Sequence, residues 1–280
     1  MSNSIVKNKL SKPVNSLTTN KEDLKKFFRI LQERADSACE LECNHIESIL
    51  ELEDIEKSKE ELRSCSELKL TVKGIDGEEL FGNIDEVFNS LSFPDKIKNI
   101  YLNSGIQYQS KFNYYPRNQF EVLLDFNRPK VFDFSFMPGD ETPNNSNFVV
   151  EGFDSTWVNG LFGEIDIFFK KNSAQFSTIH KSNIYDLFVW LIGIPTGFWL
   201  CFKVSEYLKS TFENEFLRAG VFVYVFIATL FSFRILFQYS RWLYPKIHYS
   251  TKGDTSLIHK SFFFTLITSI IAAFLLEILL

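Results

Sequence analysis

Three apolar stretches near the C-terminus constrain this chain more than any other feature of its sequence. They cover residues 184–204, 219–240 and 261–280, and short charged loops separate them. A helix of about 20 apolar residues is long enough to cross a hydrocarbon layer about 30 Å thick. Because three such segments follow one another closely, the sequence predicts three C-terminal transmembrane helices rather than buried helices of a soluble protein.

The region before these stretches has the composition of a soluble protein. Residues 1–182 hold 22 Lys and Arg against 29 Asp and Glu, a net charge of −7, whereas residues 183–280 hold 8 against 6, a net charge of +2. We therefore expect a cytosolic part that ends at residue 182 and a transmembrane region over 183–280. An acidic soluble part does not favour binding to nucleic acid. The four Cys have no recurring spacing and do not predict a disulfide scaffold.

The first 18 residues are polar and lack the apolar core of about 7–15 residues that a secretory signal needs. We expect a flexible tail over 1–18 that stays in the cytosol. Thr19 and Glu22 have the spacing of a capping box, which predicts that a helix begins there. No Gly or Pro lies between Val14 and Val72, so a helical arm is expected over 19–65.

Apolar residues of this arm recur in alternating steps of four and three, as they do in a coiled-coil seam. Glu42 interrupts the seam, and its phase slips after Leu52. The pattern fits a self-associating coiled coil or a helical hairpin that folds back on itself, and the sequence leaves both open. The seam residues are Leu24, Phe28, Leu31, Ile49 and Leu52.

Residues 66–182 change to a period of two, which predicts strands. The clearest strands are expected over 118–126 and 130–136, and a hairpin over 68–82 needs the conformational freedom of Gly74 or Gly77 in its turn. Two helices are expected, a short one capped by Asn83 or Asp85 and a long one that begins at Asp154 or Ser155. The order of elements predicts an α+β domain with a mainly antiparallel sheet of about five strands and helices on one face.

Lys and Arg lie mainly on one side of the predicted membrane. Seven of them precede the first span or lie between the second and third spans, and three lie between the first and second. This asymmetry predicts a multi-pass protein of the plasma or inner membrane whose N-terminal domain is cytoplasmic. Arg234 then lies near the inner end of the second span, where the side chain of an intramembrane charge can extend to water.

Small residues in two of the spans are candidates for close helix packing. Gly193 and Gly197 form a GxxxG motif around Pro195 in the first span, and Thr265, Ser269 and Ala273 form a stripe in the third. Packing within one chain, packing between subunits and a kinked gating element remain alternatives, the last because Pro195 leaves a helix carbonyl without its usual donor.

No pattern in the chain predicts catalysis, a cofactor or a metal. There is no nucleophile elbow, phosphate-binding Gly loop, zinc-protease helix or kinase signature. Glu164 and Asp166 point to nearly opposite sides of a helix, so we do not expect an acid/base pair. A zinc site is not expected either, because the spacing turns one candidate ligand away from the others, which are Cys39, Cys43, His45 and Cys65.

These observations favour a non-enzymatic, membrane-anchored sensor or adaptor whose cytosolic helical and α+β parts bind a partner or ligand. The alternative is a pore-forming or channel-like effector that is gated by association of its cytosolic part. Both hypotheses expect contact with membrane lipid and either a protein partner or self-association through the arm and the spans. A membrane enzyme is disfavoured, because no His, Asp and Glu cluster lies near one interface.

Overall fold

The structure is a computed structural model that describes residues 6–49, 55–132, 139–251 and 256–279. The chain forms two compact units. The first contains residues 1–127, 144–174 and 246–252, and the second contains residues 128–143, 175–245 and 253–280. The first unit therefore does not end at a single point in the sequence, because the seven residues 246–252, which follow the second apolar helix, belong to it.

The first unit is an α+β fold, as predicted, around a six-stranded sheet in the order β1-β7-β6-β5-β3-β4, in which every pair is antiparallel. A separate two-stranded parallel sheet pairs β2 with β8. The strands are β1 (Asn8–Pro13), β2 (Leu17–Thr19), β3 (Lys69–Gly74), β4 (Glu79–Asn83), β5 (Ile97–Asn103), β6 (Asn118–Asp125), β7 (Asn147–Gly152) and β8 (Ile247–Tyr249). The helices of this unit are α1 (Lys21–Ile49), α2 (Ile55–Ser66), α3 (Ile84–Asn89), α4 (Ile106–Phe112) and α5 (Ser155–Lys171).

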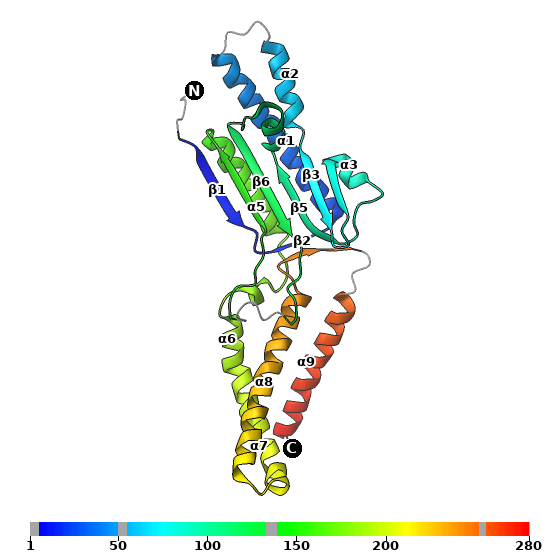
Figure 1. Cartoon of the computed structure of the whole chain (residues 1–280), viewed down its shortest axis with the longest axis vertical. Coiled ribbons are helices and arrows are strands. Elements are labelled where there is room, and N and C mark those ends of the chain that lie inside the picture. The colour runs from blue at the N-terminus through cyan, green and yellow to red at the C-terminus, as the bar shows by residue number, and fades with distance from the viewer. Residues whose placement is uncertain (1–5, 50–54, 133–138, 252–255, 280) are drawn as a thin grey trace. The chain divides into compact units, whose positions relative to one another are not determined.

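Helices cover one face of the six-stranded sheet, as the sequence predicts. In β6 the alternating residues Phe120, Val122 and Leu124 are buried, and they share one hydrophobic core with apolar residues of α1, α3 and α5. Figure 1 shows α1 and α5 behind the sheet. Asp154 caps α5 by accepting hydrogen bonds from the backbone N–H groups of Thr156 and Trp157 at 2.8 and 3.0 Å. In the turn between β3 and β4, Gly77 has a φ of +98°, as the predicted hairpin requires.

The prediction of a flexible tail over 1–18 is wrong for the described part of that segment. Asn8–Pro13 pairs with β7 as an edge strand of the main sheet, and Leu17–Thr19 pairs with β8. Neither strand has the apolar alternation that a sequence pattern can detect, because β1 lies at an edge and β2 has only three residues. Thr19 is part of a strand, so the helix cap moves by one residue: Asn20 Oδ1 accepts from Asp23 N at 2.9 Å.

The arm is not a separate domain. Leu24, Phe28 and Leu31 of the predicted seam are fully buried in the core of the sheet unit, where they already have intramolecular partners. Farther along, α2 runs antiparallel to α1 as a hairpin: Ser66 Oγ donates to Asp36 at 2.8 Å, and Arg63 pairs with Glu40 at 2.9 Å. The side chain of Ile49 and the whole of Leu52 lie outside the described residues.

The second unit contains long apolar helices (Figure 1). After residues 128–143, which belong to this unit, the chain re-enters it at residue 175 and forms a short 3₁₀ helix (η1, Ser177–His180). One continuous helix then runs over Ile184–Thr211, and a second, α8, runs over Glu215–Leu243. Both helices are long and apolar enough to cross a membrane, and only 11% of the residues in the most apolar part of each are buried, whereas a core helix of a globular protein is mostly buried. The third predicted span is also helical, as α9 (Ser256–Leu279), but within the described residues only the first two helices meet that standard.

The first long helix contains a π-helical turn. It consists of α6 (Ile184–Phe188), the π-helix η2 (Val189–Gly193) and α7 (Ile194–Thr211). The backbone N–H of Ile194 donates to the carbonyl of Val189, five residues earlier, directly before Pro195. Pro has no N–H to donate, and its ring would collide with a carbonyl of a regular helix, so a local change to π geometry accommodates it without breaking the helix.

Some expectations for the middle of the chain are not met or lie outside the described residues. Of the strand expected over 130–136, residues 133–138 are not described, and Val131 and Phe132 form a turn. Helix α4 and strand β8 have no counterpart in the sequence-based prediction. Both are short, and β8 pairs with a segment about 230 positions away, which no local pattern reveals.

Candidate functional site

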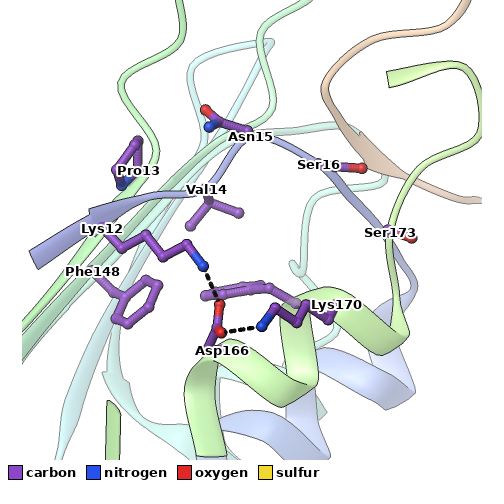
Figure 2. Close-up of a pocket in the computed structure, with 10 residues that line it drawn as sticks. Lys12, Pro13, Val14, Asn15, Ser16, Phe148, Asp166, Lys170 and Ser173 are labelled. Atoms are coloured by element: carbon purple, nitrogen blue, oxygen red, sulfur yellow. Dashed lines mark hydrogen bonds and ion pairs between the residues drawn. The ribbon is translucent and has the colours of Figure 1, made fainter. Parts of the chain in front are cut away.

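One pocket in the first unit combines a cavity with charged side chains at its rim (Figure 2). Its volume is about 160 Å³, and it lies where the end of β1, strand β7 and the last turns of α5 meet. Three buried side chains, Val14, Phe148 and Phe169, give it apolar walls. The remaining lining residues are Lys12, Pro13, Asn15, Ser16, Asp166, Lys170 and Ser173.

Two ammonium groups share one carboxylate at the rim. Lys12 Nζ lies 2.6 Å from Asp166 Oδ1, and Lys170 Nζ lies 2.7 Å from Asp166 Oδ2. The hydrogen bond from Lys12, together with that from Lys170, lowers the pKa of the Asp166 carboxyl below its usual value. The side chain of Asp166 is 19% exposed, whereas those of Lys12 and Lys170 are 44% and 71% exposed. The rim therefore carries a net charge of +1, and its ammonium groups still reach solvent.

The backbone beside the pocket is fixed by hydrogen bonds between distant parts of the sequence. Ser16 Oγ accepts from the backbone N–H of Ala174 at 2.7 Å, and the N–H of Thr18 donates to the carbonyl of Asn172 at 2.7 Å. The segment that connects β1 to β2 is thus tied to the residues that follow α5. This arrangement holds Lys12 opposite Asp166 and Lys170 on adjacent turns of the helix.

The same connector is tied to the segment that follows α8. The N–H of Leu17 donates to the carbonyl of Lys246 at 2.9 Å, and the N–H of Ser250 donates to the carbonyl of Thr19 at 2.8 Å, on either side of the β2–β8 pair. Ile247 is buried in the main core. The ring of Tyr249 packs edge-on against Phe126 at 6.0 Å. The loop between α8 and α9 therefore supplies part of the first unit's core.

A second, deeply buried polar cluster lies in the second unit. Arg241 is 0% exposed, and its Nε and Nη2 donate to the carbonyls of Ile179 and Asp140 at 2.9 and 3.1 Å. Its guanidinium carbon lies 4.8 Å from the centre of the Phe237 ring. His180 is also buried, between Thr142 Oγ1 at 3.0 Å and the carbonyl of Tyr244 at 2.5 Å. These contacts join the loop before β7, the 3₁₀ helix η1 and the end of α8.

The glycines of the GxxxG motif face α8 of the same chain. A Cβ atom at Gly197 would lie 2.8 Å from the ring of Phe226, and one at Gly193 would lie 3.6 Å from Leu230 and Phe233. Aromatic pairs continue this antiparallel contact, with ring centres 5.0 Å apart for Phe198 and Phe226 and 5.6 Å apart for Phe188 and Phe233. Pro195 is the second residue of α7 and lies between the two glycines. The structure thus places these residues in a helical hairpin.

The small residues of the third predicted span lie on an exposed surface. Thr265 and Ser269 are exposed, and Thr265 Oγ1 donates to the carbonyl of Ser261 on its own helix at 2.9 Å. The side chain of Ala273 lies outside the described residues. Arg234 is half-buried on α8.

The residues considered for zinc divide between two environments. Cys39, Cys43 and Cys65 are buried in a small apolar cluster with Tyr108, and burial raises the pKa of the Cys39 thiol to about 12. His45 instead lies 2.7 Å from a guanidinium nitrogen of Arg117. Across the described ranges, no three His, Cys, Asp or Glu side chains are grouped closely enough to hold a metal ion.

Sequence reasoning missed the residues that dominate these sites. The sequence marks Lys170 only as one of the charges that precede the first span, and Arg241 falls just beyond the predicted second span although it lies in the last turn of α8. A local signal existed for part of the pocket, because Asp166 and Lys170 have the i, i+4 spacing of a helical ion pair. No local sequence pattern links Lys12 to this pair, because Lys12 lies 154 residues before Asp166.

Comparisons of the chain with models of protein families, with curated proteins and with solved structures find no match.

Proposed function

We propose that this protein is a membrane-anchored, non-enzymatic sensor or adaptor. Its first unit binds a partner or ligand, and its second unit holds it in the plasma or inner membrane. Support comes from two long helices that expose large apolar side chains, among them Phe202, Phe216 and Tyr224, each more than two-thirds exposed. Apolar surface of this extent is costly in water and is typical of membrane or protein interfaces.

One observation carries this proposal. The chain leaves the first unit after Ala174 and returns to it at Lys246, three residues after the end of α8. Because both positions belong to one folded unit, they lie on the same side of any membrane that the intervening helices cross. The number of crossings between them is therefore even. The helix over Ile184–Thr211 and α8 then form a hairpin that crosses and returns. A third crossing by α9 would place the C-terminus on the opposite side.

The orientation follows from charge. With the first unit in the cytoplasm, Lys246 and the lysines at the end of α5 lie on the inner side, as the positive-inside rule requires. In this arrangement Phe212 to Asn214, between α7 and α8, form the outer turn. The expected contacts are membrane lipid and a protein or small-molecule partner of the first unit. No step of the proposal requires a cofactor.

Labelling of single cysteines in intact cells tests this topology. In a variant without its four native Cys, Ser210→Cys near the outer turn should react with a membrane-impermeant maleimide, and Ser11→Cys on β1 should react only after the cells are opened. Ser250→Cys, just after β8, should behave like Ser11→Cys. The hairpin proposal fails if Ser210→Cys and Ser250→Cys are labelled from the same side.

A pore-forming or channel-like effector is the alternative, and the exposed hydroxyls of Thr265 and Ser269 on α9 are the observation that favours it. The full chain reconstituted in vesicles separates the two functions. An anchor should give no ion flux above that of empty vesicles, whereas flux that Thr265→Leu with Ser269→Leu abolishes would favour the pore. Failure of the protein to remain in the membrane pellet after alkaline carbonate extraction would contradict both.

A further inference from the structure

The Lys12–Asp166–Lys170 pocket has the features of a ligand site rather than of a gap in packing. We propose that it binds a small organic anion, whose apolar body enters the cavity and whose acidic group contacts the ammonium groups of Lys12 and Lys170. This ligand would give the proposed sensor its input, but the binding itself does not depend on how the protein is anchored. Figure 2 shows the ammonium groups of Lys12 and Lys170 directed at the carboxylate of Asp166, with the side chains of Val14 and Phe148 nearby.

The size of the cavity limits the apolar body. Its volume of about 160 Å³ is close to that of cavities of about 150 Å³ that take up benzene. Because Val14, Phe148 and Phe169 are buried core residues, these walls are held in place by the fold rather than formed by the ligand. The pocket therefore fits one ring or a short branched chain, and it is too small for a nucleotide or a long acyl chain.

The rim determines the charge of the ligand. An ammonium group has three donors, and the described hydrogen bonds of Lys12 and Lys170 use one of each for Asp166. The remaining donors can bind the oxygens of a carboxylate or phosphate. Asp166 is the only acidic residue among the lining residues, so it competes with an anionic ligand while it also holds the two lysines in position. A cationic ligand would meet two positive charges against one negative charge.

Two sources can supply such an anion: a free small acid, or the head group of an anionic lipid. Both present the same chemistry to the lysines. Experiments can distinguish the two sources, because a lipid head group competes with a free acid only in a bilayer that contains that lipid.

Benzoate is a suitable probe because it carries one carboxylate on one ring. We would titrate it against the full chain in nanodiscs of phosphatidylcholine and follow binding by saturation-transfer NMR, with neutral benzamide and inorganic phosphate as comparison probes. Benzoate should bind saturably and more tightly than either comparison probe, because only benzoate combines the ring with the charge.

Charge variants make the test specific. Lys12→Gln and Lys170→Gln should each weaken benzoate binding by about fivefold, the upper end of what one solvent-exposed ion pair contributes. Asp166→Asn should tighten benzoate binding, because the variant removes the competing carboxylate. If Asp166 only held the two lysines in position, the same variant would weaken benzoate binding. Lys171→Gln removes a neighbouring charge that does not line the pocket and should change binding by less than about twofold.

The outcomes that overturn the proposal are equally definite. It is wrong if benzamide binds as tightly as benzoate, if inorganic phosphate does so, or if Asp166→Asn weakens binding as much as the lysine variants do. If benzoate binding persists in nanodiscs that contain phosphatidylglycerol, the source is a free acid. The source is a lipid head group if phosphatidylglycerol displaces benzoate from the unaltered protein and Lys170→Gln causes no further loss of benzoate binding in that bilayer.

Discussion

At the scale of single residues, buried polar groups in this protein hold distant segments together. Glu42 interrupts the apolar seam of α1, yet it is buried and accepts hydrogen bonds from the hydroxyl of Tyr114 and from the backbone N–H of Arg117. The carboxylate thus fixes the loop before β6 against α1. A buried carboxylate that accepts two hydrogen bonds fixes the segments that donate them, whereas a buried carboxylate without donors would destabilise the fold.

Glu42→Ala should therefore destabilise the first unit by about 1–3 kcal/mol, because it removes the buried carboxylate that accepts from the Tyr114 hydroxyl and the Arg117 N–H. The matched control is Glu40→Ala, two residues earlier, whose exposed pair with Arg63 should contribute less than about 1 kcal/mol. Chemical denaturation of the full chain in detergent measures both. Equal losses for the two variants would contradict the role assigned to Glu42.

At the scale of elements, the sequence predicts those that carry their own pattern. The alternation in β6, the Asp154 cap of α5 and the apolar length of α8 are local, and each of these elements occurs where it is expected. The elements that it misses depend on partners far away. Strand β1 pairs with β7 across more than 130 residues, and the pocket needs Lys12 and Asp166 together. Local periodicity contains no information about such pairs.

The helical hairpin of the second unit gives an element-scale prediction. Gly197→Leu would drive a side chain into the ring of Phe226, so it should weaken the packing of α7 on α8 by about 1–3 kcal/mol. Gly220→Leu on α8 is the control, because a Cβ atom there meets nothing within 4 Å. Thermal unfolding in detergent should separate the two variants, and membrane insertion should be unchanged in both. A larger loss in Gly220→Leu would show that the glycine motif does not pack this hairpin.

At the scale of the whole molecule, the first unit is built from three separate stretches of sequence. Burial of Ile247 and the β2–β8 pair make the segment after α8 part of that unit's core. Cutting the chain at the boundary expected from charge, residue 182, would therefore remove native contacts as well as the apolar helices. The sequence-based boundary marks where hydropathy changes, which is not where the folded unit ends.

Two fragments of the chain test whether β8 is an integral part of the first unit. One ends at Ser182, and the other joins Ala174 to Lys246 through a flexible linker and ends at Thr251. The second should be more stable by at least about 2 kcal/mol, because it keeps the buried side chain of Ile247. Ile247→Ala in the linked fragment should remove most of that gain. If the fragment ending at Ser182 unfolds at the same denaturant concentration, β8 is not an integral part of the unit.

The position of β8 in the chain also has a consequence for biosynthesis. A ribosome completes both long apolar helices before it makes Ile247, so the N-terminal strand β2 has no partner during most of translation. Until then the nascent first unit has an incomplete core, and its last strand arrives only after the hairpin has been synthesised. The core of the first unit can therefore be completed only after both long apolar helices have been synthesised.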